Sequence, residues 1–460
     1  MSLAPEYTAP TQPAETVRYP NLATQPAIPA LAAGSTAWRD YFADPALQAL
    51  ITQALDNNRD LRIAVLRVEE ARAAFGIQRA EQFPTIAAET SGTRGLTPGD
   101  LNITGRPLQA NQYQVGLGFN AWELDFWGRV RNLKSVALEN YLASESASRA
   151  ATLSLIAQVA NAYISLCELN ERIDLAQQTV ASRLESYRIF SRRVAVGSTS
   201  RLDLNQVQTL LTQAQTLEAQ LGQARAAQLH ALIQLAGSTP AETLQNVRCT
   251  ERTILPELRV GLPAELLTAR PDIIAAEHQL KAANANIGAA RAAFFPRITL
   301  TGSLGTASAE LGGLFESGSR AWSFVPRLTL PIFDAGRNRS NLDLAEVRRN
   351  ITVANYERTI QAAFREVADA LSAHHWLSRQ YVFQQDTLSA QTERARLAKL
   401  RYDNGATPYL EVLDAQRDLL NAEQQRVQTR RALLSSRIAL YAALGGGMLT
   451  QGKPPTAADW

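Results

Sequence analysis

The segment ANANIGAARAAFFPRI at positions 283–298 decides the fold, because a second version of it, ARAAFGIQRAEQFPTI, occupies positions 71–86. Gly288 matches Gly76, so the two copies are offset by 288 − 76 = 212 residues. Arginine and proline also coincide at this offset, which chance similarity between alanine-rich helices would hardly produce. The chain therefore contains an internal duplication, and a repeat must be identified before a fold is predicted.

The duplication continues beyond this segment with a slightly different spacing. Gly405 matches Gly197, an offset of 405 − 197 = 208, so the first copy has four extra residues between Pro84 and Gly128. Each copy reads as a helix that ends at proline, two strands, a very long helix up to a glycine turn, and a further helix. We predict helices and strands at the following positions: helices 46–82, 128–196 and 201–236 with strands 85–93 and 113–126, then helices 263–294, 334–404 and 409–444 with strands 297–306 and 321–332.

The strands and the long helices have different periodicities. Apolar Val115, Leu117 and Phe119 alternate with polar or small residues, which indicates strands with one apolar and one polar face. The long helices repeat apolar residues at three- and four-residue spacing, as coiled coils do. A continuous helix from 128 to 196 would be about 100 Å long, outside the range of a compact domain.

Composition alone suggests a soluble protein. The 460 residues carry 46 Lys and Arg against 43 Asp and Glu, so the net charge of +3 is no signature of nucleic-acid binding. A hydrophobic content of 46% is too high for a disordered chain. Cys167 and Cys249 are too few for a disulfide scaffold or a cysteine-rich zinc site. The nearest approach to a membrane helix, 150–167, lacks charges but contains Gln158 and Asn161.

The N-terminal region leaves two interpretations open. The chain begins MSLAPEY, without the charged and apolar regions of a signal peptide, and proline recurs through the next 35 residues. This composition predicts an extended tether. It is either a disordered cytosolic tail or the arm of an exported protein whose signal has been removed.

Two hairpins supply four strands, too few to close a barrel. An open sheet packed on a helix is one alternative. However, strands of roughly 10 residues with aromatic ends, such as Trp122 and Trp322, are typical of outer-membrane barrels. Three chains would supply 3 × 4 = 12 strands, within the known barrel range, and cyclic symmetry would close the ring. If the shorter helices stack end to end in pairs, the same trimer has 12 helical columns.

At this point the sequence resembles the trimeric outer-membrane factors of bacterial tripartite efflux pumps, the TolC/OprM/CusC/MtrE-like family of NodT type. The resemblance covers about residues 36–447 and is most specific in the following stretches: RPDI (270–273), AEHQLKAANANIGAARAAFFPRI (276–298), LPIFDAGRNRSNLD (330–343), YLEVLDAQR (409–417) and ALGGG (443–447). It implies an α+β membrane protein, with a 12-stranded outer-membrane β-barrel continuous with a 12-helix periplasmic α-barrel.

The resemblance also implies a division of the chain and a lipid anchor. The parts are an N-terminal arm (1–35), a first repeat (36–237), an equatorial connection (238–262), a second repeat (263–447) and a C-terminal equatorial tail (448–460). Relatives of this branch begin with a lipidated cysteine where this chain has Met1. Met1 is therefore expected to replace the lipid-bearing residue of the native protein.

The turns at Gly197 and Gly405 are expected to form a periplasmic gate. Leu410 and Asp414 share one helix face beside Glu411, so each acid would form a ring of three in a trimer, which favours cations. The resemblance implies that these positions line the closed tip, and it matches Tyr402 and Asp203 with a tyrosine and an acid that tie the tip shut. Some relatives use an arginine two residues after the glycine; here Thr407 stands there, so Arg201 or Arg401 is expected to substitute.

No catalytic, metal or cofactor motif is apparent, and neither an enzyme nor a nucleic-acid partner is expected. The His374–His375 pair points apart on a helix, and the glycines at 445–447 read as a helix end. The predicted function is an exit duct that passes small toxic compounds to the exterior, with a periplasmic adaptor and an inner-membrane proton-driven pump of the RND type as partners. Protein secretion, copper or silver export, and a soluble coiled-coil scaffold remain alternatives; metal export fits poorly, because Met1 and Met448 are the only methionines.

Overall fold

The computed structural model of the chain describes residues 2–8, 31–32, 36–238, 247–254, 258–259 and 270–447. The predicted lipidation position Met1 and C-terminal tail 448–460 lie outside these residues, as do most of the arm 1–35 and most of the connection 238–262. The chain divides into two compact units. We call them the sheet unit (Met1–Pro10, Val68–Ser144 and Ala275–Tyr356) and the helical unit (Thr11–Arg67, Glu145–Ile274 and Glu357–Trp460).

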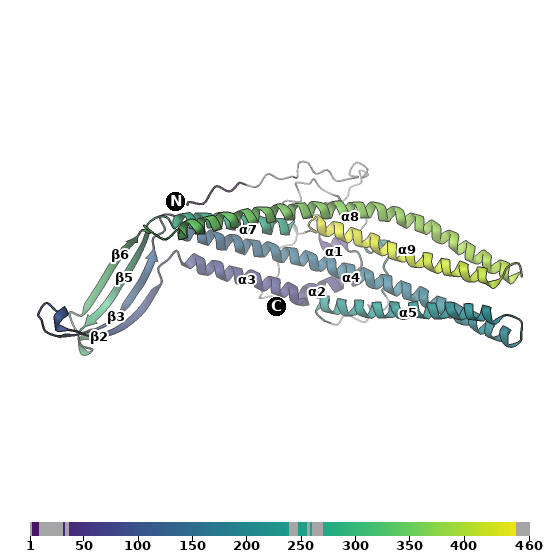
Figure 1. The fold of residues 1–460 in the computed structure, drawn as a ribbon, viewed down its shortest axis with the longest axis horizontal. Coiled ribbons are helices and arrows are strands. Elements are labelled where there is room, and N and C mark those ends of the chain that lie inside the picture. The colour runs from purple at the N-terminus through teal and green to yellow at the C-terminus, as the bar shows by residue number, and fades with distance from the viewer. Residues whose placement is uncertain are drawn as a thin grey trace. The chain divides into compact units, whose positions relative to one another are not determined.

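The sheet unit contains one four-stranded antiparallel sheet in the order β2-β3-β5-β6 (Figure 1). Its strands are β2 (Ile86–Thr97), β3 (Leu108–Glu123), β5 (Arg297–Ser308) and β6 (Arg320–Thr329). The first hairpin is longer than predicted, because pairing continues through polar residues up to Thr97 and Leu108. The last strand ends at Thr329 instead of 332, since its pairing partner β5 begins only at Arg297.

The register places apolar residues in rows on one face of this sheet. Ala88, Leu117, Leu304 and Trp322 lie directly opposite one another across the four strands. The next residue of each strand points to the opposite face, and there the row holds small and polar residues. In that row the hydroxyls of Ser303 and Ser323 are hydrogen-bonded at 2.7 Å. The predicted two-faced character of the strands is thus confirmed. Leu117 is 59% exposed and Trp322 73% exposed, so none of the described residues covers the apolar row.

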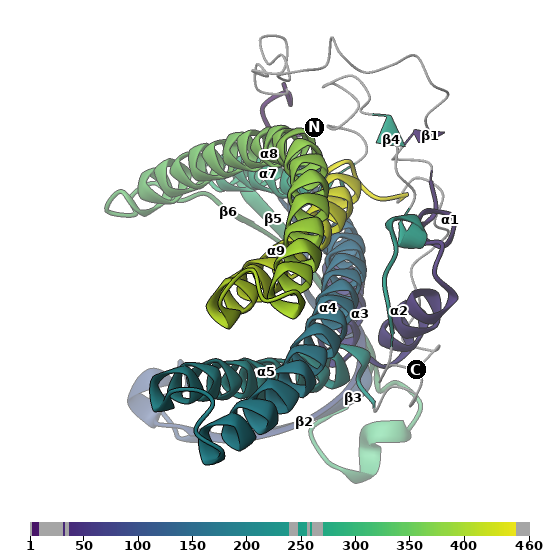
Figure 2. The same cartoon turned by 90° about the vertical axis from the view of Figure 1, so that its right-hand side faces the viewer.

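The helices include two uninterrupted helices of 67 residues each, α4 (Arg129–Ala195) and α8 (Arg337–Asp403). In the helical unit α4 lies beside α5, and α8 lies beside α9 (Figures 1 and 2). An 18-residue window of α4 is apolar enough to cross a membrane, but 56% of it is buried within the chain, as in a core helix. The other described helices are α1 (Trp38–Tyr41), α2 (Pro45–Asn57), α3 (Arg59–Ala80), α5 (Arg201–Ala236), α7 (Pro271–Ala292) and α9 (Tyr409–Ala443), with short 3-10 turns η4 (Gly99–Leu101), η6 (Glu251–Thr253) and η7 (Gly312–Phe315).

The prediction of one helix over 46–82 is wrong, because Asn58 divides it into α2 and α3. Asn58 has an extended backbone and is 3% exposed. Its side-chain oxygen accepts a hydrogen bond from the amide of Leu61 (2.9 Å) and so caps α3. Its side-chain nitrogen donates to the carbonyl of Leu235 at the end of α5 (2.9 Å), which joins α5 to the start of α3.

An equivalent joint connects α9 to α7. Arg270 lies 270 − 58 = 212 residues after Asn58, and Ala443 lies 443 − 235 = 208 residues after Leu235, the same offsets as in the duplication. Arg270 Nη1 donates to the carbonyl of Ala443 (3.0 Å), as Asn58 does to its counterpart. These two bonds support the predicted end-to-end stacking of the shorter helices. Only the second joint carries a charge, which Asp272 (2.6 Å) and Glu366 (2.8 Å) neutralise.

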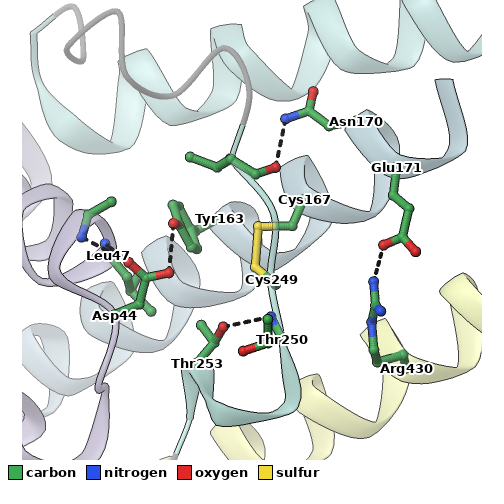
Figure 3. The surroundings of a disulfide bond; sticks show 12 residues. Asp44, Leu47, Tyr163, Cys167, Asn170, Glu171, Cys249, Thr250, Thr253 and Arg430 are labelled. Carbon is green, nitrogen blue, oxygen red and sulfur yellow. Dashed lines mark hydrogen bonds and ion pairs between the residues drawn. A yellow bond between two sulfur atoms is a disulfide. The ribbon is translucent and has the colours of Figure 1, made fainter. Parts of the chain in front are cut away.

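A disulfide that the sequence analysis does not predict joins Cys167 of α4 to Cys249 (Figure 3). Both cysteines are buried, and 82 residues separate them in the chain. The segment 247–254 that carries Cys249 also receives a hydrogen bond from Asn170 at the carbonyl of Val247 (3.1 Å). Two cysteines indeed form no scaffold, but this single bond fixes 247–254 against α4.

Candidate gate at the helix-hairpin tips

Two helical hairpins of the helical unit end in tight glycine turns. The first joins α4 to α5 at Gly197, and the second joins α8 to α9 at Gly405 (Figure 2). Their φ angles are +74° and +72°, in the left-handed region that favours glycine. Glycine in this conformation ends a helix and reverses the chain, so both predicted tips are true hairpin ends.

Aromatic side chains pack the two hairpins together near these turns. Phe190 of α4, Val207 of α5 and Leu413 of α9 form a buried cluster. The ring of Tyr409 lies against this cluster, with its centroid 4.7 Å from that of Phe190 and 4.8 Å from that of Tyr402. The contacts between hairpins are therefore mainly apolar, and polar groups surround them.

The first tip is held by a local cap. The side chain of Asp203 accepts hydrogen bonds from the hydroxyls of Ser200 (2.7 Å) and Thr199 (2.9 Å) and from the amide of Ser200 (3.2 Å). In return the Ser200 hydroxyl accepts from the amide of Asp203 (3.1 Å), which completes a capping box. The bonds from Ser200 and then Thr199 lower the pKa of Asp203, because they favour its charged form.

The second tip lacks this cap. Pro408 occupies the position equivalent to Ser200 (200 + 208 = 408) and makes no side-chain hydrogen bond to α9. Glu411, the counterpart of Asp203, instead accepts from Arg401 Nη1 across the turn (2.9 Å). Asp414 pairs with Arg417 (3.2 Å), one turn further along α9. At the second tip the acidic side chains are therefore bound by arginines, whereas at the first tip hydroxyl groups bind the acid.

The predicted site residues are brought together only in part. The hydroxyl of Tyr402 accepts a hydrogen bond from Arg193, and Asp203 accepts from Ser200 and Thr199 in its own cap. The predicted link between Tyr402 and Asp203 is therefore absent within the described part of this chain. Arg401 reaches Glu411, whereas Arg201 is exposed at the start of α5. Leu410 is 47% exposed.

Two arginines of this site, Arg193 and Arg183, were not predicted from the sequence. Arg193 could have been found, because it is the counterpart of Arg401 (193 + 208 = 401). Arg183 is 3% exposed, and its Nη2 donates to the carbonyl of Leu413 over a long 3.4 Å. Its Nη1 is buried without a hydrogen-bond partner among the described residues, and burial lowers its pKa. The sequence could have indicated Arg183, because it is a single cation in the apolar stripe that includes Tyr187 and Phe190.

Comparisons with known proteins point in one direction. Residues 50–238 and 262–446 match the family described as outer membrane efflux protein. The solvent efflux pump outer membrane protein SrpC of Pseudomonas putida is 46% identical over 409 residues, 89% of this chain and 87% of that protein.

Solved structures agree with this match. A membrane protein from Pseudomonas aeruginosa is 42% identical with a TM-score of 0.91, over 97% of this chain and 100% of that one. The MtrE outer membrane channel of Neisseria gonorrhoeae, in its open state, is 39% identical with a TM-score of 0.88, over 97% of this chain and 99% of that one.

Proposed function

Because this chain belongs to the outer membrane efflux protein family, we propose that three copies form a gated exit duct that releases small organic compounds from an efflux pump. Family membership, the channel fold class and the outer-membrane location agree with the expectations drawn from the sequence. The family consists of channels and is not an enzyme family.

The exposed apolar row of the sheet is the observation that carries the proposal. Leu117, Leu304 and Trp322 are each more than half exposed on one face, whereas the other face holds Ser303 and Ser323. Burying such a row in lipid is favourable, but a sheet with open edges cannot stay in hydrocarbon, where every backbone group must be paired. Closing the edges requires more strands, and three chains supply 3 × 4 = 12.

The tips supply the gate of this duct. Rings formed by Leu410, Glu411 and Asp414 would narrow the periplasmic end and favour cations. The exposed Arg401–Glu411 pair contributes only about 0.5 kcal/mol, so closure depends on several links around a ring. Within each chain Tyr402 bonds to Arg193, and between chains Tyr402 and Asp203 would add the ring-closing links. Many individually weak links can keep the tip closed and still be broken when a partner protein binds.

The partners are those of a tripartite pump. The relative SrpC is named as part of a solvent efflux pump. An inner-membrane proton-driven pump and a periplasmic adaptor would therefore supply the substrate and open the tip, and the duct needs no nucleotide. Small apolar or amphipathic organic compounds are the proposed substrates.

The start of the chain fits a lipid anchor at position 1. Ser2 donates a hydrogen bond to Asn132 (2.8 Å), and Asn284 donates to the carbonyl of Pro5 (2.8 Å), all within the sheet unit. Asn132 lies nine residues after the end of β3, so the first residues bind near the base of the sheet. A lipid on a cysteine at position 1 would thus enter the same membrane as the strands.

Single-channel conductance in planar bilayers tests the gate. Tyr402→Phe combined with Asp203→Ala removes a hydroxyl and an acid from the tips, and the conductance should rise because the ring-closing links are lost. Asp386→Asn, an exposed acid on α8 away from the tips, serves as the matched control and should leave the conductance unchanged. Wild-type conductance in the double variant would contradict the assignment of the gate.

A further inference from the structure

The helical unit contains a cavity of about 930 Å³ between α4, α5, α8, α9 and the start of α7. It lies on the face of α4 that carries Gln158 and Asn161, whereas Tyr163 and Cys167 on the opposite face contact Asp44 and Cys249. The cavity is thus separated by a helix from the disulfide. Its volume is within the range of pockets that hold drug-sized molecules.

The floor of the cavity is apolar. Leu153 of α4 and Leu235 of α5 line it together with alanines from three helices, among them Ala157, Ala370 and Ala439. Small side chains at these positions leave the space open, and their methyl groups offer dispersion contacts to an apolar ligand. A ligand with an apolar body therefore fits this part of the wall.

The charged part of the wall is acidic. Asp272, Glu366 and Asp369 line the cavity against one cation, Arg270, a formal balance of 1 − 3 = −2. Arg270 is 7% exposed, and its donors are already directed at Asp272, Glu366 and the carbonyl of Ala443. Arg365 pairs with Asp369 at 3.6 Å, but this exposed pair contributes little. The excess negative charge therefore favours a cation.

The amide groups of the wall add polar contacts without a charge preference of their own. Asn161 donates its side-chain nitrogen to the carbonyl of Ala157 (2.9 Å), and Gln158 donates to the hydroxyl of Ser154 (2.9 Å). Each amide group keeps one further N–H as well as its oxygen, so it can bind either a donor or an acceptor on a ligand. The carboxylates therefore set the preference for a positively charged ligand.

We propose that this cavity is a transient binding site for organic cations with an apolar body, such as aromatic amines protonated at neutral pH. The inference rests on the proposed function and specifies its substrate class: the site would lie along the route through the duct and hold a substrate weakly. Weak binding is required because a conduit must release what it admits.

Binding of rhodamine 6G, a cationic aromatic dye, to the purified trimer in lipid nanodiscs tests the proposal. Fluorescence anisotropy would be measured, with the signal of empty nanodiscs subtracted. Asp369→Asn should raise the dissociation constant about fivefold, the upper range for one exposed charge. Ala157→Phe should abolish binding by filling the cavity. The control Asp386→Asn, which lies on α8 as Asp369 does, should leave the dissociation constant unchanged. Equal dissociation constants in all four proteins would overturn the proposal.

The same samples separate this inference from the proposed function. A wild-type trimer that conducts ions in planar bilayers but binds rhodamine 6G no differently from Asp369→Asn overturns the cation site alone. A wild-type trimer that forms no channel overturns the exit duct. If Ala157→Phe fails to assemble, Asp369→Asn still decides, because this exposed change creates no strain.

Discussion

The two repeats of the chain are built from the same elements but are held by different bonds. The first repeat has the disulfide at Cys167, whereas the equivalent position (167 + 208 = 375) is the exposed His375. The joint between helices of the first repeat is made by the neutral Asn58. The joint of the second repeat is made by Arg270, which is ion-paired. Duplication thus preserved the backbone path, while the bonds at these two equivalent places diverged: covalent and neutral in the first repeat, ionic at the joint of the second.

The disulfide should give the largest effect. It closes a loop of 82 residues, so replacing both cysteines by serine should lower the free energy of unfolding by about 4.5 kcal/mol in the chain-entropy model. Thermal unfolding of the oxidised trimer would be compared with that of the Cys167→Ser, Cys249→Ser variant. Reducing agent should destabilise the wild type to the same extent and leave the variant unchanged.

His375→Ser at the equivalent position of the second repeat is the matched control. It should leave the melting temperature nearly unchanged, because His375 is exposed and closes no loop. A similar loss in both repeats would remove the contrast between them.

The joints should give the next largest effect, and an unequal one. Arg270→Ala leaves Asp272, Glu366 and the carbonyl of Ala443 without their common partner and should cost about 3 kcal/mol. Asn58→Ala removes a helix cap and one donated bond and should cost about 1.5 kcal/mol. Chemical denaturation at low and high salt would measure both. The comparison fails if salt reduces the two losses equally, because only the Arg270 joint is ionic.

Replacing Arg183 should raise the stability of the protein, in contrast to the changes above. This buried guanidinium has one long hydrogen bond and an Nη1 atom without a partner in the described part of the chain, so its desolvation is poorly compensated. Arg183→Met should therefore raise the stability of the packed hairpins by about 2 kcal/mol. Thermal unfolding should shift upwards, and channel conductance should fall if packed hairpins keep the gate closed. Gln391→Met, the equivalent position (183 + 208 = 391), should do neither.

Features that depend on local periodicity could be predicted from the sequence, whereas bonds between residues far apart in the chain could not. Alternation in β3 and the glycines at 197 and 405 follow from neighbouring residues, so the strand faces and hairpin turns were correct. The break at Asn58 lies within a stretch whose sequence is typical of one helix, and it depends on a carbonyl 235 − 58 = 177 residues away. The disulfide likewise joins residues that no sequence spacing connects. The bonds that distinguish the repeats were therefore the part that required a structure.

The tips give the smallest effect and the sharpest contrast, because their acids are equivalent residues with different partners. Hydrogen bonds from Ser200 and then Thr199 lower the pKa of Asp203, so the cap is complete above the carboxyl's unfolded pKa of about 3.9 and is lost as pH falls through the lower folded value. Ser200→Ala should raise the pKa of Asp203 and speed amide hydrogen exchange in the first turn of α5 about fivefold. Arg401→Ala should speed exchange at the start of α9 only about twofold, and 1 M salt should remove this difference by screening the exposed pair. The Ser200→Ala effect should persist in salt, since the hydroxyl bond it removes is short-ranged and uncharged on the donor side. If both effects disappeared in salt, the first tip would be held by charge as well, and the two repeats would differ in their joints and disulfide but not at the gate.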